Sequence, residues 1–239
     1  MSRRRRKKKK MKGTTPEKPA APNQGPGKAN VPIKSATVGP LLVLLSAPSG
    51  GGKTTVCQER LAARPDMTRA ITCTTRAPRL GEKDGVDYYF LDAESFLKRV
   101  QAGNFLEHAT VYGNIYGTLK SEVLNKLRQG RDVLLNVDVQ GAASIRAHAE
   151  EDAELKKALV TVFLTPPSLA VLEDRLKKRG TDSPAEIRKR LSRARQEITQ
   201  WKHFDYLLIS ASIPDDLSRM QAIIEAEKMR SERAVAPEL

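Results

Sequence analysis

Three consecutive glycines, Gly50 to Gly52, are followed directly by Lys53 and Thr54. Glycines let a backbone approach a ligand closely, and the N–H groups of such a turn can converge on one anion. A lysine at the next position can reach terminal phosphates, and a hydroxyl after it can coordinate Mg²⁺. The spacing therefore predicts a loop that holds the phosphates of a nucleotide. The residues expected to form it are Ala47, Pro48, Ser49, Gly50, Gly51, Gly52, Lys53 and Thr54.

The stretch departs from the usual G-x-x-x-x-G-K-[ST] pattern at one position, because Ala47 replaces the first glycine. The last glycine, the lysine and the hydroxyl keep the required spacing. A glycine-rich turn that only links a strand to a helix is the simpler alternative. Such turns rarely carry Gly-Lys-Thr after a buried strand, so the pattern favours phosphate binding.

Asp138 ends the apolar run DVLLNVD and is the expected partner of this loop. Acids commonly end strands, so Asp138 alone is weak evidence. Together with Lys53 and Thr54 it completes a nucleotide–magnesium site, where a carboxylate helps to order Mg²⁺ and its waters. We therefore expect Thr54 and Asp138 to serve the metal, directly or through water.

A second group of polar side chains lies further along the chain. Two guanidinium groups and a phenol suit a phosphate dianion, because guanidinium forks match phosphate oxygens and a phenol donates one more hydrogen bond. A carboxylate can accept from adjacent N–H donors, as guanine presents at its Watson–Crick edge. Each residue alone is more simply an exposed charge or a packed tyrosine, but the set in one segment favours a ligand site. Its members are Arg76, Arg79, Tyr88, Glu107 and Tyr116.

Three arginines, Arg175, Arg179 and Arg190, lie on either side of the Arg-Gly-Thr turn that begins at Arg179. A mobile basic lid that closes over phosphates would neutralise charge that develops during transfer and would exclude water. A solvated basic helix face explains the same residues equally well.

Apolar runs and helical patterns alternate along the chain, which predicts an α/β fold with a parallel sheet and helices on both faces. The irregular stretch over residues 72–118 interrupts this rhythm, and we expect it to fold over the carboxyl ends of the strands, where such folds bind ligands. Strands are expected at residues 41–45, 70–75, 105–111, 132–138, 159–165 and 205–210, and a glycine–tyrosine turn at 112–118. Helices are expected from 53 through 64 and at 93–101, 121–129, 140–148, 168–178, 185–201 and 214–230.

The composition suits one domain with a substantial core, since the chain has 239 residues of which 39% are hydrophobic. No apolar run is long enough to span a bilayer, so no transmembrane segment is expected. The two cysteines, Cys57 and Cys73, lack metal-ligand spacing and are expected to be buried free thiols. Free thiols indicate a reducing compartment, and we expect a cytoplasmic protein.

The net charge of +14 is concentrated at one end of the chain. Residues 1–38 hold 12 Lys/Arg and one acid, which leaves only +3 for the remainder. This segment has too little apolar surface to offset its ordering entropy, so it is expected to be a disordered basic tail. RNA, DNA or an acidic membrane surface could attract it, and a solvated tail without a partner is the alternative. No apolar stretch follows the charges, which argues against a secretory signal.

The motifs together resemble the guanylate kinase family over about residues 40–210. The resemblance implies a P-loop nucleoside monophosphate kinase fold, with a parallel sheet core flanked by helices, an inserted GMP-binding lobe at about 72–118 and a lid at about 176–192 within a domain over 39–239. It implies transfer of the ATP γ-phosphoryl group to GMP, and also dGMP, with Mg²⁺ bound as MgATP, giving ADP and GDP in purine nucleotide metabolism and GMP recycling. The stretches that carry it are APSGGGKTT, TTRAPRLGEKDGVDYYF, FLEHATVYGNIYGT, NVDVQGA and TPPSLAVLEDRLKKRGTDSPAEIRKRL.

The resemblance also assigns roles by position. Glu107 corresponds to the acid that reads guanine, and Thr72 and Thr118 stand where the family commonly has serines that bind the base. The full set that it implies for GMP is Thr72, Arg76, Arg79, Tyr88, Glu107, Tyr116, Thr118 and Asp138. The set that it implies for catalysis is Lys53, Arg76, Arg179 and Arg190, with Arg179 also on ATP.

The chain departs from the family pattern at two places. Asn136 stands where an acid is usual, so it can hydrogen-bond but supplies no charge. Ser210 begins SASIPDD where the family often has Asn-Asp-Asp, which weakens the match on the adenine side.

Two other classes of protein remain possible from the sequence. Guanylate-kinase-like binding modules of scaffold proteins keep the fold without catalysis, but a scaffold has no need of Gly-Lys-Thr and Asp138. A kinase of the same fold could act on a sugar phosphate, but Glu107 with two threonines suits guanine better. The sequence is compatible with either a monomer or a homodimer.

Overall fold

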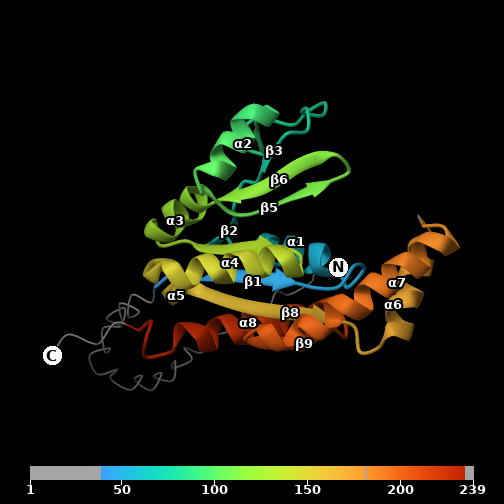
Figure 1. Ribbon diagram of the computed structural model, residues 1–239. Helices are drawn as coiled ribbons and strands as arrows, with labels where there is room; N and C mark the ends of the chain where they lie inside the picture. The colour runs from blue at the N-terminus through green and yellow to red at the C-terminus, as the bar shows by residue number, and fades with distance from the viewer. Residues whose placement is uncertain (1–38, 181, 235–239) are drawn as a thin grey trace, which may run out of the picture. The chain divides into compact units, whose positions relative to one another are not determined.

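The computed structural model describes residues 39–180 and 182–234, so the predicted basic tail over residues 1–38 lies outside the described residues. Five of the described strands form one sheet in the order β2-β7-β1-β8-β9, and every neighbouring pair is parallel (Figure 1). The predicted parallel core sheet is therefore confirmed. Its strands are β1 (Leu42–Ser46), β2 (Met67–Arg69), β7 (Asp132–Asn136), β8 (Leu159–Thr165) and β9 (Tyr206–Ile209).

Helices cover both faces of this sheet, which explains the unbroken apolar run at β1. Leu42 and Leu44 pack into a cluster with residues of α3, α4 and α5. Leu41, Val43 and Leu45 point the other way, because successive strand residues alternate faces, and pack with α1 and α8. These helices are α1 (Lys53–Ala63), α3 (Lys120–Arg128), α4 (Val139–Glu151), α5 (Ala153–Ala158) and α8 (Ile213–Lys228).

A second sheet, in the order β4-β3-β6-β5, forms from the segment between β2 and α3. It packs against α2 (Ala93–Gln101), where the Phe96 and Phe105 rings stack with centroids 4.5 Å apart. Its strands are β3 (Cys73–Thr74), β4 (Tyr89–Phe90), β5 (Phe105–Val111) and β6 (Asn114–Leu119).

Two local predictions in this region were wrong. The strand expected at 70–75 is reduced to β3 in the small sheet, and β2, which joins the large sheet, ends before it at Arg69. The turn expected at 112–118 comprises only Tyr112 and Gly113, and the rest is β6. Gly117 suggested a turn but lies inside a strand, where an added Cβ would come within 2.9 Å of the Glu107 carbonyl oxygen.

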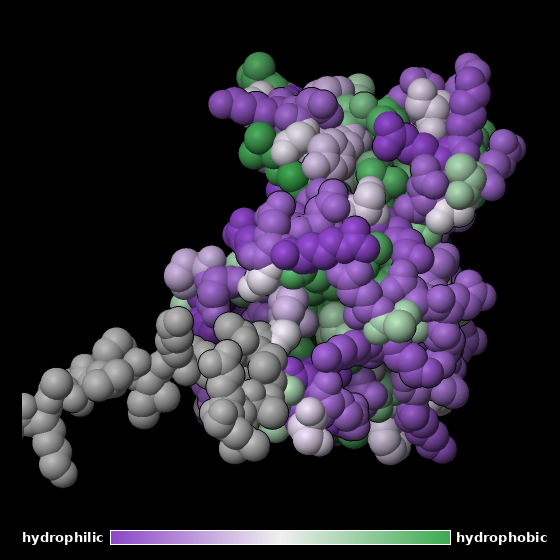
Figure 2. All heavy atoms as spheres, turned by 90° about the vertical axis from the view of Figure 1, so that its left-hand side faces the viewer, coloured by the Kyte–Doolittle hydropathy of each residue, from purple (hydrophilic) through white to green (hydrophobic). Residues whose placement is uncertain are grey.

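Helices α6 (Leu169–Arg179) and α7 (Pro184–Ile198) pack on each other through their own apolar cluster. Ser168 and Ser183 cap them by accepting backbone N–H groups, and Gly180 ends α6 with φ +67°. A 3₁₀ turn, η1 (Thr199–His203), links α7 to β9. Hydrophilic side chains cover most of the face in Figure 2, as expected when apolar residues are packed inside. Within the described ranges, none of the helices has the length and apolarity that a membrane span needs.

Candidate functional site

The loop between β1 and α1 has the backbone shape that its glycines permit. Gly50 and Gly52 have φ values of +87° and +94°, in the left-handed region, and the Gly51 N–H donates to the Pro48 carbonyl at 2.8 Å. A Cβ on Gly50 would lie 2.7 Å from Cδ2 of Leu176 on α6. The backbone angle therefore favours glycine at position 50, and an added Cβ would also push against the Leu176 side chain.

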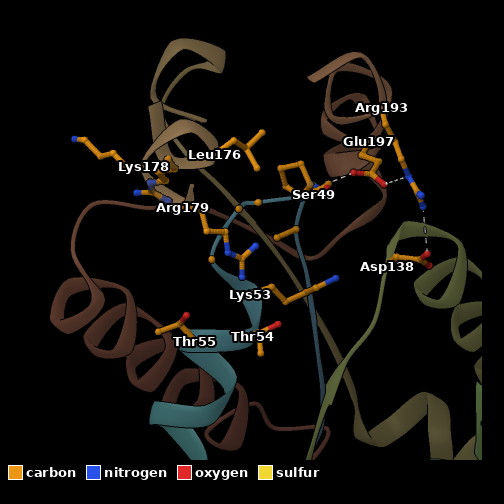
Figure 3. Close-up of a pocket in the computed structure, with 16 residues that line it drawn as sticks. Ser49, Lys53, Thr54, Thr55, Asp138, Leu176, Lys178, Arg179, Arg193 and Glu197 are labelled. Carbon is orange, nitrogen blue, oxygen red and sulfur yellow. Dashed lines mark hydrogen bonds and ion pairs between the residues drawn. The ribbon is translucent and has the colours of Figure 1, made fainter. Parts of the chain in front are cut away.

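The N-terminus of α1 is open, whereas α4, α6 and α7 are each capped by a side chain. The first N–H groups of a helix have no intrahelical partner, and the helix dipole favours negative charge at this end. They border a cavity of about 570 Å³ (Figure 3). Its cationic lining residues are Lys53, Arg175, Lys178, Arg179 and Arg193, against the acids Asp138 and Glu197. The cavity is built to hold a polyanion.

Lys53 lies in the wall of this cavity, at the first position of α1. Its Nζ donates to the Val137 carbonyl at 2.8 Å, just beyond the carboxyl end of β7. Burial lowers the pKa of the Lys53 amine, and the negative charge of Asp138 acts in the opposite direction. The amine is thus held close to where phosphates would enter the loop.

Thr54 and Asp138, the expected metal residues, both line the cavity. The Thr54 hydroxyl accepts from Asn136 Nδ2 at 3.4 Å, so the neutral residue at the family's acid position contacts the hydroxyl. Asp138 Oδ1 caps α4 by accepting the N–H groups of Gln140 and Gly141, at 3.1 and 2.9 Å. One carboxylate oxygen and one hydroxyl fit Mg²⁺, which takes few protein oxygens and keeps waters and phosphates. The described residues contain no group of three His, Cys, Asp or Glu that would hold a metal alone.

At the edge of the second sheet, the structure brings Arg76, Tyr88 and Tyr116 close together. The Arg76 guanidinium lies 5.4 Å from the Tyr88 ring centroid, and the Tyr88 and Tyr116 rings are 6.1 Å apart. Arg76 Nη2 also contacts both carboxylate oxygens of Glu82, at 2.8 and 2.9 Å. The Glu82 carboxylate accepts the Arg79 N–H as well, at 2.7 Å, while the rest of Arg79 is exposed.

Glu107 lies on β5, where its Oε1 accepts the Thr118 hydroxyl at 2.6 Å. Burial raises the pKa of Glu107, the Thr118 hydrogen bond lowers it, and the charge of Asp138 raises it further. A Cβ on Gly141 would lie 3.5 Å from Glu107 Oε2 and 3.6 Å from Asp138 Oδ1, so both acids border the start of α4. Thr72 directly precedes β3, whose Cys73 pairs with Gly117 beside Thr118.

The two arginines expected to act from the lid are placed differently. Arg179 lines the cavity, and so does Arg175, whose Nη2 donates to Ser210 Oγ at 3.2 Å. Arg190 is not among the lining residues, because its guanidinium pairs with Asp182 at 3.2 Å and with Glu186 at 3.8 Å. Its role on the phosphates stays a prediction.

Sequence reasoning missed four charged residues of these sites: Glu82, Lys178, Arg193 and Glu197. The spacing of Arg193 and Glu197, four residues apart on one helix, is a signal that could have found them. The only sequence signal for Glu82 is its negative charge, which lies a few residues after the positive charge of Arg76.

A family model described as guanylate kinase matches residues 40–227 of the chain. The chain belongs to the guanylate kinase family. The chain is 42% identical over 190 residues to a guanylate kinase of Maricaulis maris, covering 80% of this chain and 84% of that protein. It is 41% identical to one of Paramagnetospirillum magneticum, covering 82% and 88%.

Structural comparison agrees with this assignment. The crystal structure of guanylate kinase from Anaplasma phagocytophilum matches with a TM-score of 0.62 and 31% identity, covering 84% of this chain and 93% of that one. The resemblance to guanylate kinases and the α/β kinase fold drawn from the sequence are therefore confirmed. The basic segment over residues 1–38 lies outside the range that the guanylate kinase model matches.

Proposed function

We propose that this protein transfers the γ-phosphoryl group of ATP to GMP, and also to dGMP, giving ADP and GDP in purine nucleotide metabolism and GMP recycling. The observation that carries the proposal is the uncapped, glycine-shaped N-terminus of α1, which borders a cavity lined by five cations. Membership of the guanylate kinase family supports the same reaction.

The donor side of the proposed reaction is the phosphate loop. Backbone N–H groups at the start of α1 would hold the ATP phosphates, with Lys53 on the terminal ones and Arg179 above them. Thr54 and Asp138 would hold Mg²⁺, directly or through water, as part of MgATP. Bound there, the ion supplies positive charge to the phosphate oxygens.

The acceptor side is the second sheet, which would bind GMP. Arg76 and the two tyrosines beside it form a donor set for a phosphate, with Arg79 at the edge. Glu107 would accept the adjacent N–H groups of guanine, with hydroxyls contributed by Thr72 and Thr118.

The chemistry requires alignment and charge neutralisation rather than a general base. The attacking GMP phosphate is already an oxyanion, so the protein must bring two anions together and stabilise the transferring group. Lys53, Arg76 and the lid arginines Arg179 and Arg190 would supply that charge. Closure of the lid would exclude water and so protect ATP from hydrolysis.

A coupled ADP-release assay with GMP, dGMP, AMP, CMP and UMP, each with and without Mg²⁺, tests the proposal. We expect turnover with GMP and dGMP alone, and only when Mg²⁺ is present. Turnover of AMP equal to that of GMP would overturn the assignment of Glu107 to guanine. No turnover with any monophosphate would refute the reaction itself.

A cytoplasmic location and a monomeric or homodimeric state complete the proposal. Cys57 and Cys73 are both buried free thiols, which suits a reducing compartment. Cell fractionation and sedimentation equilibrium would test the two points separately.

A further inference from the structure

Glu197, near the C-terminal end of α7, reaches the phosphate loop from the lid side (Figure 3). Its Oε2 accepts the backbone N–H of Ser49 at 2.9 Å, and its Oε1 pairs with Arg193 Nε at 2.8 Å. The Glu197 side chain is only 8% exposed. A buried carboxylate is costly unless it is paired, and here each oxygen has its own partner.

The contact falls on a specific part of the loop. Glu197 fixes the N–H of Ser49, and the Pro48 carbonyl fixes that of Gly51. These two contacts set the shape of the first half of the loop, before α1 begins. The N–H groups at the start of α1 remain available to an anion, because none of the side chains in the described ranges caps that helix.

The same carboxylate connects the loop to Asp138. Arg193, held by Glu197, lies with Nη2 3.7 Å from Asp138 Oδ2, while Asp138 Oδ1 caps α4. The series Ser49, Glu197, Arg193 and Asp138 therefore runs from the phosphate loop through α7 to the start of α4 (Figure 3). The two contacts of Glu197 are charged hydrogen bonds, which are stronger than neutral ones, whereas Arg193 and Asp138 form a longer ion pair.

A carboxylate beside a cavity for phosphates weakens their binding, because its negative charge repels theirs. Five cations line the cavity against two acids, so the surroundings stay positive despite Glu197. We propose that Glu197 is a positioning residue for the donor nucleotide, which holds the phosphate loop and orients Arg193 toward Asp138. Because Glu197 lies on α7, which also contains part of the predicted lid, its hydrogen bond connects that helix to the phosphate loop. The inference rests on the proposed function for the identity of the donor as MgATP.

Two substitutions separate the contacts that Glu197 makes. Glu197→Gln keeps an oxygen for the Ser49 N–H but removes the charge that holds Arg193, whereas Glu197→Ala removes both. The readouts are MgADP affinity by calorimetry, the KM values for MgATP and GMP, and the melting temperature. We expect MgADP affinity to fall about tenfold in Glu197→Ala and about threefold in Glu197→Gln, with the MgATP KM following and the GMP KM unchanged.

Glu173→Gln is the matched control. Glu173 lies on α6, makes a similar pair with Lys177 four residues on at 2.7 Å, and does not line the cavity. We expect it to leave MgADP affinity and both KM values unchanged, since exposed pairs contribute little.

Three results would overturn the proposal. They are unchanged MgADP affinity in Glu197→Gln and Glu197→Ala, equal increases of the two KM values, and a loss of affinity in the Glu173→Gln control as large as in Glu197→Gln. If Glu197→Ala does not fold, the Glu197→Gln comparison decides alone. Calorimetry with MgADP does not require GMP turnover, so a wild-type protein that fails to phosphorylate GMP would refute the proposed function without deciding the role of Glu197.

Discussion

The donor and acceptor sides of the proposed site differ in whether their anion-binding groups already have a partner within the protein. At the phosphate loop the groups are backbone N–H donors at the start of α1, which no side chain caps among residues 39–180 and 182–234. Beside the second sheet the group is the Arg76 guanidinium, whose Nη2 donates to Glu82 and whose Nη1 donates to the Ala77 carbonyl. The N–H groups at the start of α1 can therefore bind a ligand anion directly, whereas Arg76 already pairs with the carboxylate of Glu82.

The difference follows from what each group is made of. Backbone donors at the start of α1 have no side-chain rotamers to lose, and the glycines before them adopt left-handed angles that shape the loop. An arginine side chain loses up to about 2 kcal/mol of rotamer entropy when it is ordered. Glu82 orders Arg76 before any ligand arrives, and its hold on the Arg79 N–H orders the loop around it. Both sides thus have a supporting carboxylate, but Glu82 contacts the anion-binding group itself, whereas Glu197 contacts Ser49 and not the start of α1.

The largest effect should come from the loop. We expect Lys53→Ala to lower turnover of GMP about 10²- to 10³-fold, because a charged donor to the transferring group is lost. The coupled ADP-release assay measures it, with Lys98→Ala as control, since Lys98 is 71% exposed on α2. Undiminished turnover in Lys53→Ala would show that Lys53 of the phosphate loop takes no part in phosphoryl transfer.

Glu107→Gln should have the next largest effect, on the acceptor side. An amide offers one acceptor where the carboxylate offers two, so we expect the GMP KM to rise about tenfold or more and discrimination against AMP to fall. The MgATP KM should not change. Unaltered selectivity between GMP and AMP would show that another group reads the base.

The same residue predicts a pH dependence. GMP binding needs the ionised carboxylate, which is present above the pKa of Glu107 and lost as the pH falls through it. Because burial raises that pKa above the ordinary 4.5, the GMP KM should begin to rise at a higher pH than for an exposed glutamate. Glu107→Gln should show no such rise over the same range. An acidic rise that persists in the variant would assign it to another group.

Glu82→Gln tests the acceptor restraint directly and should act more weakly. Loss of the charged hold on Arg76 should raise the GMP KM about three- to tenfold and leave the MgATP KM unchanged. Steady-state kinetics with each substrate varied in turn would measure this. A lower GMP KM would show instead that Glu82 competes with the phosphate.

The smallest effect is one of stability. Tyr112 and Gly113 join β5 to β6 with φ values of +48° and +81°, the two positive angles that a type I′ turn requires. Tyrosine is poorly suited to this angle, and its side chain is almost fully exposed, at 94%. Tyr112→Asn should stabilise the protein by about 1 kcal/mol in urea unfolding. Tyr112→Phe should change nothing, and an equal gain there would exclude the backbone explanation.

The loop could be predicted from the sequence because one contiguous stretch determines it. Residues 41–55 contain the buried strand, the glycines and the first turn of α1, and local rules apply to each. The parallel sheet was predictable for the same reason, since β7 and β8 are apolar runs bounded by clear breaks.

The acceptor side could be predicted only in part, because tertiary pairing shapes it. Gly117 suggested a turn from the sequence, but in the structure it lies in β6 and approaches β5 closely. The residues around Thr72 cross from one sheet to the other, and no local pattern marks that crossing. The spacing of Glu197 indicates Arg193 as a partner but not the Ser49 N–H, which lies 148 positions away.

The first core strand has its two ends at opposite edges of the sheet. The Gly39 N–H, just before β1, donates to the Arg233 carbonyl at 3.5 Å, and the five residues of β1 then span about 17 Å before the phosphate loop begins. Residue 39 therefore lies at the rear of the sheet, away from the nucleotide entrance. Tripolyphosphate, which carries a chain of phosphates without a base, should inhibit at the loop end of this strand by competing with MgATP.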